Sequence, residues 1–397
     1  MTGTSKVVVI GAGYTGMLAA IGVAQRAKRR VQVVLVNPLE RFTERLRMHQ
    51  LATGQHLADH RIPDLLTGTG IGFVQGSATG IDTDAHTLAV STVDGQTSIG
   101  YDFLVYAIGS TTDTGAVPGA AEHAFTLNSP HSARRLAEHL AAARDGTEFL
   151  VCGAGLTGIE AATEIAESHR NIRVTLLSRD EPATMMGAKA RAYLMAALAR
   201  LGVSVRTGVS VAKVLPEGVE LAGGEFVAAD GCLWTTGVRV AALATKAGIT
   251  TDGYGRIITD ATLRSVSHPE IYAVGDSAAI SQAYGVIHGT CQSGIPSAAH
   301  AAANIARRLR GRPAKPFRFG YIHQPVSLGR KDAVIQFTYA DDTPRRWFIT
   351  GRAAILYKEI VSSSPITTFR LSKRMAISSR VLASTGGRRN SRATRHP

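Results

Sequence analysis

The chain has 397 residues and a mass of 41.9 kDa, enough for two or three domains of ordinary size. Hydrophobic residues make up 45% and charged residues 19%, so we expect a sizeable core, which argues against extensive disorder. No apolar run approaches the roughly 20 residues needed to cross a bilayer, and the N-terminus predicts no secretory signal. Three cysteines are too few for a disulfide scaffold or a zinc site, so we expect a reducing compartment and no metal.

The formal net charge of +14 is concentrated near the C-terminus. Residues 345–397 contain twelve Lys or Arg and one acid, so the rest of the chain is nearly balanced. Any partner implied by the basic charge therefore belongs to this end of the chain. Few aromatic residues are interleaved with these cations, so stacking on bases is not provided and no nucleic-acid partner is expected.

Two segments, 7–21 and 149–167, share one pattern: an apolar run, then Gly-Ala-Gly-x-Thr-Gly, then an Ala-rich stretch with helical periodicity. A second strand pattern follows each of them. In such a unit the first glycine makes a tight turn, the second lets the backbone approach a pyrophosphate, and the third allows close helix–strand packing. The repeat therefore predicts two dinucleotide-binding units. Their glycines are Gly11, Gly13 and Gly16, and then Gly153, Gly155 and Gly158.

Three further strand patterns, at 101–111, 231–239 and 270–279, contain a glycine at the carboxyl end; these are Gly109, Gly237 and Gly275. The last pattern also carries Asp276 and precedes an Ala-rich helical pattern. A carboxylate in that place suits the binding of polyol hydroxyls, and an ordinary helix N-cap is the alternative.

The motif order GAGYTG, AIGS, GAGLTGIE, WTTGV and IYAVGDSA resembles the two-dinucleotide-binding-domain flavoproteins of the pyridine nucleotide-disulfide reductase fold. These include type II NADH dehydrogenases, apoptosis-inducing factor and ferredoxin reductases. The resemblance covers about residues 5–340, and the stretches 37–54 and 317–336 look most like the type II NADH:quinone group.

The resemblance implies an α/β fold with two Rossmann-like, doubly wound dinucleotide-binding domains. An NAD(P)-binding domain, 113–239, would be inserted into a discontinuous FAD-binding domain, 1–112 and 240–312. A C-terminal region with the basic tail, 313–397, would complete the chain.

The resemblance also implies cofactor ligands. The first glycine motif, with Tyr14 and Thr15, and Asp276 would hold FAD, whereas the second motif, with Thr157, would hold the nicotinamide nucleotide. Ala78 lies where many relatives hold the adenine through main-chain atoms. Arg45 and His49 lie in the segment that covers the flavin ring, where a cation would stabilise the reduced flavin. A solvated helix face is the alternative for Arg41, Arg45 and Arg47.

The cysteine positions argue against disulfide and sulfide chemistry. Residues 37–57 contain none, so the paired cysteines of disulfide reductases are missing there. Cys152 and Cys232 lie in strand patterns and are expected in the core. Cys291 is the candidate for a place near the flavin.

Residues 288–309 match the helix that begins beneath the flavin in the resembling family. Gln292 matches one glutamine of the quinone-pocket pattern, but Pro296 replaces the other. Gly294 and Ile295 would offer backbone N–H groups to the flavin, and a plain helix start with Pro296 in its first turn is the alternative. Glu160 is, with Gln292, a candidate catalytic residue, because relatives point an acid in this place toward the nicotinamide. The alternative is an acid that only complements the helix dipole.

The ends of the second strands in the two units lack the acid that usually binds the ribose 2′-hydroxyl. The first unit has Asn37 there, which can bind hydroxyls without charge. The second has Ser178 followed by Arg179, which suits a 2′-phosphate and favours NADPH. Asp180 and Glu181 leave a ribose-binding acid open as an alternative.

We therefore expect an FAD-dependent NAD(P)H oxidoreductase that passes electrons to a quinone or a similar aromatic acceptor. One alternative is a soluble flavin reductase or dehydrogenase acting on a small metabolite or a redox carrier protein. Another is a nucleotide-sensing interaction protein like apoptosis-inducing factor. We expect a cytoplasmic location and consider a homodimer, with peripheral attachment to the cytoplasmic membrane face as an open alternative.

Membrane attachment is a hypothesis about the C-terminal region. Residues 347–361 have apolar positions at near-helical spacing, and residues 366–382 mix apolar with basic side chains. Such segments can lie in a membrane interface. The alternative is a docking helix followed by a disordered basic tail, 386–397.

Overall fold

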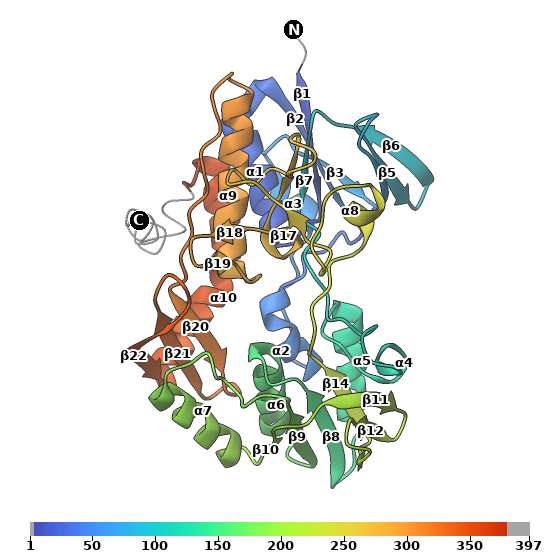
Figure 1. Ribbon diagram of the computed structural model, residues 1–397, viewed down its shortest axis with the longest axis vertical. Helices are drawn as coiled ribbons and strands as arrows, with labels where there is room; N and C mark the ends of the chain where they lie inside the picture. The colour runs from blue at the N-terminus through green and yellow to red at the C-terminus, as the bar shows by residue number, and fades with distance from the viewer. Residues whose placement is uncertain (1–3, 379–397) are drawn as a thin grey trace.

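The computed structural model describes residues 4–378, and its elements form an upper and a lower lobe in the view of Figure 1. A five-stranded parallel sheet in the order β16-β7-β1-β2-β3 forms the centre of the upper lobe. Its strands are β1 (Ser5–Ile10), β2 (Val31–Asn37), β3 (Gly72–Gln75), β7 (Phe103–Tyr106) and β16 (Ile271–Ala273). The β-branched run of β1 is fully buried, as expected for a parallel sheet covered on both faces. The helices α1 (Tyr14–Ala27) and α9 (Cys291–Arg308) pack against each other in this lobe.

A second parallel sheet, in the order β10-β9-β8-β14, forms the lower lobe. Its strands are β8 (Thr147–Cys152), β9 (Ile172–Leu177), β10 (Ser204–Arg206) and β14 (Gly231–Trp234). The helices of this lobe are α4 (Ala120–His123), α5 (Pro130–Ala141), α6 (Leu156–Ser168) and α7 (Ala188–Arg200). In both sheets the strand that precedes the glycine loop lies between its two neighbours, which places each loop at a topological switch point.

Smaller elements surround the two sheets. Three antiparallel sheets are formed by β4 (Ser77–Asp82), β5 (Thr87–Thr92) and β6 (Gly95–Gly100), by β11 (Val211–Leu215), β12 (Gly218–Leu221) and β13 (Phe226–Ala228), and by β20 (His323–Ser327), β21 (Ala333–Thr338) and β22 (Pro344–Thr350). The strand pairs are β15 (Ile257–Ile258) with β17 (Ala278–Ala279), and β18 (Ser281–Gln282) with β19 (Gly285–Val286). The short helices are η1 (Lys28–Arg30), η2 (Arg45–Arg47), α2 (Met48–Ala52), α3 (Ile62–Leu66), α8 (Leu243–Lys246) and η3 (Gly275–Ser277).

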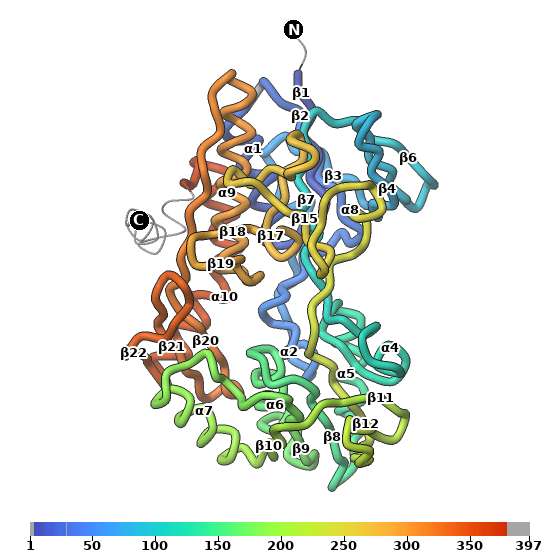
Figure 2. The backbone as a smooth tube through the Cα atoms, viewed as in Figure 1, coloured from blue at the N-terminus to red at the C-terminus, as the bar shows by residue number. Residues whose placement is uncertain are grey.

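Two segments that pass between the lobes run close together (Figure 2). Thr111 and Arg239 form an antiparallel bridge there, and Arg239 Nη2 lies 2.9 Å from Asp113 Oδ2. The Trp234 indole N–H also donates to the Asp113 carbonyl. Because the bridge lies at the expected limits, we propose the division into 1–112 with 240–312, 113–239 and 313–397.

The C-terminal helix α10 (Gly351–Arg374) differs from the sequence expectation. Trp347 lies on the strand β22 rather than in a helix, and one continuous helix joins the later part of the first expected segment to residues 366–374 of the second. Residues 379–382 of the second segment lie outside the described residues. This helix packs on α1 and β21, with Phe369 fully buried against Phe42. Among residues 4–378, no helix is long and apolar enough to cross a bilayer. The predicted tail at 386–397 lies outside the described residues.

Candidate functional site

The first glycine loop joins β1 to α1. Gly11 has φ +93°, and a Cβ there would lie 2.4 Å from the Ala107 carbonyl oxygen. A Cβ on Gly16 would lie 1.7 Å from the Gly11 carbonyl oxygen, so close packing requires both glycines. A Cβ on Gly13 would meet nothing within 4 Å, and α1 begins there without a side-chain cap. The helix start is therefore open beside Gly13 and has no side-chain cap for its first N–H groups, which fits a pyrophosphate.

The second glycine loop, between β8 and α6, repeats this geometry. Gly153 has φ +112°, and a Cβ on Gly158 would lie 1.8 Å from the Gly153 carbonyl oxygen. A Cβ on Gly155 would meet nothing within 4 Å, and α6 begins without a side-chain cap. Thr157 is exposed in the first turn of this helix. The cradle thus fits a second pyrophosphate.

Tyr14 and Thr15 lie between the first loop's glycines and pack against neighbouring segments. Tyr14 is buried, its hydroxyl accepts a hydrogen bond from the Leu46 N–H at 3.4 Å, and burial raises its pKa well above the ordinary value. A Cβ on Gly275, which has φ +65°, would lie 2.7 Å from the Thr15 methyl group. Both residues thus position the loop.

Asp276 lies in η3, at the carboxyl end of β16. Its Oδ2 accepts a hydrogen bond from the Ser110 hydroxyl at 2.9 Å, and Arg45 donates to the Ser110 carbonyl at 2.7 Å. Gly109, with φ +70° and open space around it, precedes Ser110. The N-cap alternative for Asp276 is wrong, because the strand β17 and the β18–β19 pair intervene before α9, and Thr290 caps that helix. Asp276 and Arg45 therefore share one polar edge beside the first loop.

The Asn37 side chain supports the first glycine loop. Its Oδ1 accepts a hydrogen bond from the Ala12 N–H at 2.9 Å, and its Nδ2 donates to the Leu39 carbonyl at 2.7 Å. The Asn37 carbonyl accepts from the Gly76 N–H, two residues before Ala78 on β4. Asn37 and Ala78 therefore lie near one sheet edge, with the Asn37 amide already hydrogen-bonded.

Four side chains from four segments meet where the lobes adjoin; we call Glu160, Lys358, Ser327 and His49 the junction cluster. Lys358 Nζ lies 2.6 Å from Glu160 Oε1, which also accepts from the Ser327 backbone N–H at 3.0 Å and hydroxyl at 3.1 Å. His49 Nδ1 lies 4.0 Å from Glu160 Oε2. His49 belongs to α2, which lies between the lobes in Figure 1.

Electrostatics set the protonation of this cluster. Burial alone would raise the pKa of Glu160, but Lys358, His49 and the Ser327 hydrogen bond outweigh it and hold the pKa below its ordinary value. Burial lowers the pKa of His49 to about 4, so its ring is neutral at pH 7. Within the part of the chain that the structure describes, the buried His49 Nε2 has no hydrogen-bond partner. The Glu160–Lys358 ion pair and the unpaired ring nitrogen of His49 thus lie between the two lobes that carry the glycine loops.

Lys358 and Ser327 are site residues that sequence reasoning missed. Lys358 occurs in a basic stretch interpreted as a surface, and nothing in its spacing connects it to Glu160. These residues come together because β20 packs against α6 and α10 packs on β20.

Gln292, the second candidate catalytic residue, lies near the start of α9. Its Nε2 donates to the His323 carbonyl at 2.9 Å, and its Oε1 accepts from the Ile322 N–H at 2.7 Å. Both ends of the amide thus tie α9 to the start of β20, so the structure supports a positioning role for Gln292.

The first turns of α9 differ from expectation. The helix begins at Cys291, so Pro296 lies in its second turn, and the first-turn alternative is wrong. The Gly294 N–H donates to the Thr290 carbonyl at 2.8 Å and is not free for a ligand. Ile295 is half-buried and packs against the core of the upper lobe.

The arginines before α2 are not all solvated. Arg41 is exposed and pairs with Asp59, as a surface residue would. Arg47 is largely buried and pairs with Glu359 on α10, so the solvated-face alternative is wrong for it. Arg45 is held by Ser110, as described above.

The cysteines occupy the places expected of core residues. Cys152 and Cys232 are buried, with their sulfurs 3.4 Å apart. Cys291 is half-buried; burial, with a contribution from Asp276, raises its pKa to about 12. Such a thiol is un-ionised at pH 7 and is a poor nucleophile. Within residues 4–378, no group of three or more His, Cys, Asp or Glu is placed to hold a metal ion.

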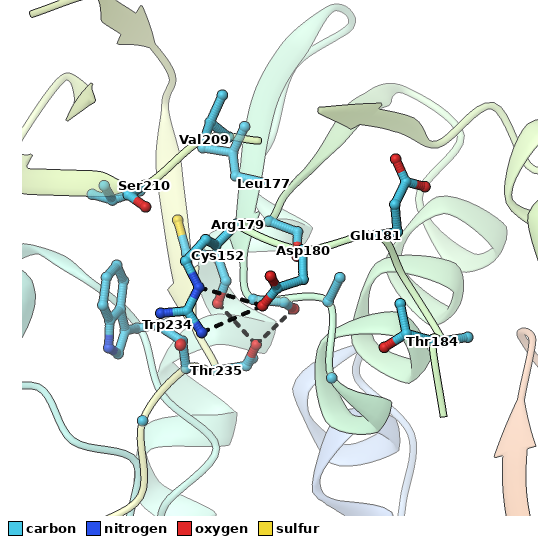
Figure 3. Close-up of a pocket in the computed structure, with 18 of the residues that line it drawn as sticks. Cys152, Leu177, Arg179, Asp180, Glu181, Thr184, Val209, Ser210, Trp234 and Thr235 are labelled. Atoms are coloured by element: carbon cyan, nitrogen blue, oxygen red, sulfur yellow. Dashed lines mark hydrogen bonds and ion pairs between the residues drawn. The ribbon is translucent and has the colours of Figure 1, made fainter. Parts of the chain in front are cut away.

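A cavity of about 510 Å³ adjoins the second glycine loop (Figure 3). Gly153, Gly155 and Gly237 line it, together with Ser178 and Arg179 at the end of β9. Several of the residues predicted for the second dinucleotide therefore line one cavity, but Thr157 and Gly158 do not line it. Asp276 and the first loop lie in the other lobe.

Comparison with known proteins identifies the family. Residues 5–306 match the model of the pyridine nucleotide-disulphide oxidoreductases. An NADH dehydrogenase-like protein of Mycobacterium tuberculosis is 32% identical, over 91% of this chain and 94% of that protein. A type II NADH:quinone oxidoreductase of Staphylococcus epidermidis is 26% identical, over 91% and 95%. The sulfide:quinone oxidoreductase structure of Aquifex aeolicus has a TM-score of 0.79 and 20% identity, over 93% and 92%.

These matches confirm the predicted fold of two Rossmann-like units and the prediction of an FAD-dependent NAD(P)H oxidoreductase. The chain belongs to the pyridine nucleotide-disulphide oxidoreductase family.

Proposed function

We propose that the protein oxidises NAD(P)H through FAD and reduces a quinone. The observation that carries this proposal is the pair of helix starts after the glycine loops, one in each lobe, both without a side-chain cap and both with open space beside the second glycine. The first loop with Asp276 would hold FAD, and the second would hold the nicotinamide nucleotide. FAD supplies the chemistry of accepting a hydride and releasing electrons.

The chain's own residues bind and orient these groups. The ionised Glu160–Lys358 pair gives the junction a fixed polar face, and neutral His49 offers an unpaired ring nitrogen beside it. Because reduction of a quinone to a quinol consumes protons, a polar cluster at this place suits such an acceptor.

The cysteines support a quinone over a disulfide or sulfide acceptor. Within the described residues, Cys152 and Cys232 lie in the core of the lower lobe, and burial keeps the Cys291 thiol un-ionised. The relatives named above include a type II NADH:quinone oxidoreductase. A soluble flavin reductase acting on a metabolite or carrier protein stays the alternative.

The test is steady-state oxidation of NADH and NADPH by the purified, flavin-loaded protein. Acceptors would be a short-chain quinone, a disulfide, sulfide with quinone, and a redox carrier protein. We expect rapid quinone reduction and no thiol-dependent turnover. Turnover only with the carrier protein would overturn the quinone proposal.

We also propose peripheral membrane contact through α10. The helix exposes Leu356 and Ile360, one turn apart, and Leu371 farther along, and Met375 is exposed directly after the helix ends. Trp347 on β22 is 77% exposed. Apolar side chains such as these, in a region rich in Lys and Arg, suit an anionic membrane interface.

Co-sedimentation with anionic vesicles tests this contact. The double variant Leu356→Ser with Ile360→Ser should lose binding, whereas Val93→Ser, at an exposed hairpin in the upper lobe, should not. A chain ending at Ser378 separates the contribution of the helix from that of the basic residues that follow. Equal failure of the wild type and all variants to bind would overturn the proposal. A homodimer stays a prediction from sequence.

A further inference from the structure

The end of β9 is the part of the second unit that contacts the adenosine ribose in dinucleotide folds. Ser178, Arg179, Asp180 and Glu181 follow β9 in sequence and line the 510 Å³ cavity. An acid in this place binds the two ribose hydroxyls of NADH, whereas an arginine accommodates the 2′-phosphate of NADPH. Asp180, Glu181 and Arg179 are the candidate ligands for the ribose or its 2′-phosphate. The hydrogen bonds that each side chain already makes decide which of them is available.

Two partners hold the carboxylate of Glu181. Its Oε2 lies 2.6 Å from Arg191 Nη2, on α7, and its Oε1 accepts from the Thr207 hydroxyl at 3.1 Å. Arg191 is itself fixed, since its Nε donates to the Pro182 carbonyl at 3.0 Å. We call Glu181, Arg191 and Thr207 the latch. Figure 3 shows the Glu181 side chain pointing away from Arg179 and Asp180.

Asp180 is paired with Arg179, but only weakly. Arg179 Nε and Nη2 both lie 3.3 Å from the same oxygen, Asp180 Oδ2, and the two side chains are 80% and 71% exposed. Exposed pairs of this kind contribute about 0–1 kcal/mol. A phosphate dianion offers a guanidinium two charge-assisted hydrogen bonds in fork geometry and is the stronger partner. Arg179 can therefore exchange Asp180 for a phosphate, leaving the Asp180 carboxylate in solvent.

Ser178 completes the arrangement because it adds no charge. Its backbone N–H donates to the Arg206 carbonyl at 2.9 Å, and its carbonyl accepts from the Val209 N–H at 3.1 Å. These bonds fix the chain direction from which Arg179 projects.

We propose that the end of β9 is a 2′-phosphate site that selects NADPH, with Arg179 as the phosphate ligand and the latch as the device that withholds Glu181 from the ribose. This inference rests on the proposed function only in taking the second glycine loop as the nicotinamide nucleotide site.

Binding of nucleotide fragments to the flavin-loaded protein tests the proposal without turnover. The fragments are 2′,5′-ADP and 5′-AMP, which differ in the 2′-phosphate, and calorimetry measures both affinities. We expect the wild type to bind 2′,5′-ADP about tenfold or more tightly, since charge-assisted hydrogen bonds contribute about 1.5–3 kcal/mol. Arg179→Gln should abolish that preference.

The latch is tested by releasing Glu181. Arg191→Gln should weaken the binding of 2′,5′-ADP and strengthen the binding of 5′-AMP. Thr207→Val should change both affinities in the same direction but by less. Adding Glu181→Gln to Arg191→Gln should restore the preference, because the released acid is then gone. If Arg191 instead bound the phosphate directly, the double variant would stay impaired, and the latch would be refuted.

Arg173→Gln is the matched control. It breaks another exposed Arg–Glu pair, Arg173 Nε to Glu148 Oε1 at 2.5 Å, at the opposite end of the same strand, and should change neither affinity. Tighter binding of 5′-AMP than of 2′,5′-ADP by the wild type would overturn the phosphate site alone. Binding of neither fragment would overturn the assignment of the second loop, and with it the proposed function.

Discussion

Replacing Lys358 by Met tests whether the junction cluster is held by its buried ion pair. The substitution removes the cation 2.6 Å from Glu160 Oε1 and keeps a similar side-chain volume. Removing one partner of a buried pair costs about 3–5 kcal/mol, because the other charge is left without compensation. The two hydrogen bonds from Ser327 remain, so we expect a loss near the lower figure, about 3 kcal/mol.

The pH dependence of the unfolding free energy gives a more specific prediction. In the wild type, the folded-state pKa of Glu160 lies below its ordinary value, so its stabilising contribution is present at neutral pH and is lost as the pH falls through that folded-state pKa. Without Lys358, burial should raise the pKa of Glu160 above its ordinary value. The carboxyl group would then be protonated on mild acidification, at little cost. The difference in unfolding free energy should therefore be largest at pH 8 and shrink toward pH 5.

Urea unfolding of the flavin-loaded protein, followed by circular dichroism, measures this difference. Lys358→Met combined with Glu160→Gln should recover most of the loss at pH 8, because no buried charge remains. Lys213→Met, at an exposed position on β11, is the control and should change stability by less than about 0.5 kcal/mol. A loss for Lys358→Met below about 1 kcal/mol at pH 8, or one independent of pH, would refute the reasoning.

Glu164→Gln should stabilise the protein at pH 8 by up to about 3 kcal/mol and have little effect near pH 4. Burial raises the pKa of Glu164 to about 7, so ionisation of this carboxyl group above that range destabilises the wild-type fold. Thermal unfolding across pH checks this, and equal shifts at both pH values would contradict it. Asp276→Ala should weaken flavin retention during dialysis about tenfold or more, with circular dichroism as the control for folding; unchanged retention would remove Asp276 from the flavin site. Replacing Cys152, Cys232 and Cys291 together by Ala should leave quinone reduction largely intact, and loss of flavin reoxidation in a folded variant would show that a thiol carries electrons.

The local pattern of the sequence determined the two glycine loops. Gly11 and Gly153 need positive φ, and Gly16 and Gly158 lie against the loop carbonyls. These are requirements of a few consecutive residues, so spacing reveals them without tertiary information. The strand β16, which ends just before Asp276, was recognisable in the same way, since its apolar run and Gly275 are close in sequence.

The tertiary structure alone decided the chemistry around those loops. Lys358 meets Glu160 only because β20 packs against α6 and α10 packs on β20. The Gln292 side-chain amide is hydrogen-bonded at both ends because the start of β20 lies beside α9. The direction of Glu181 likewise depends on α7 and the segment after β10. Charge and hydrogen-bond partners act over a few ångströms of space, whereas residue patterns record only neighbours along the chain, so protonation and side-chain direction at such a site follow from packing.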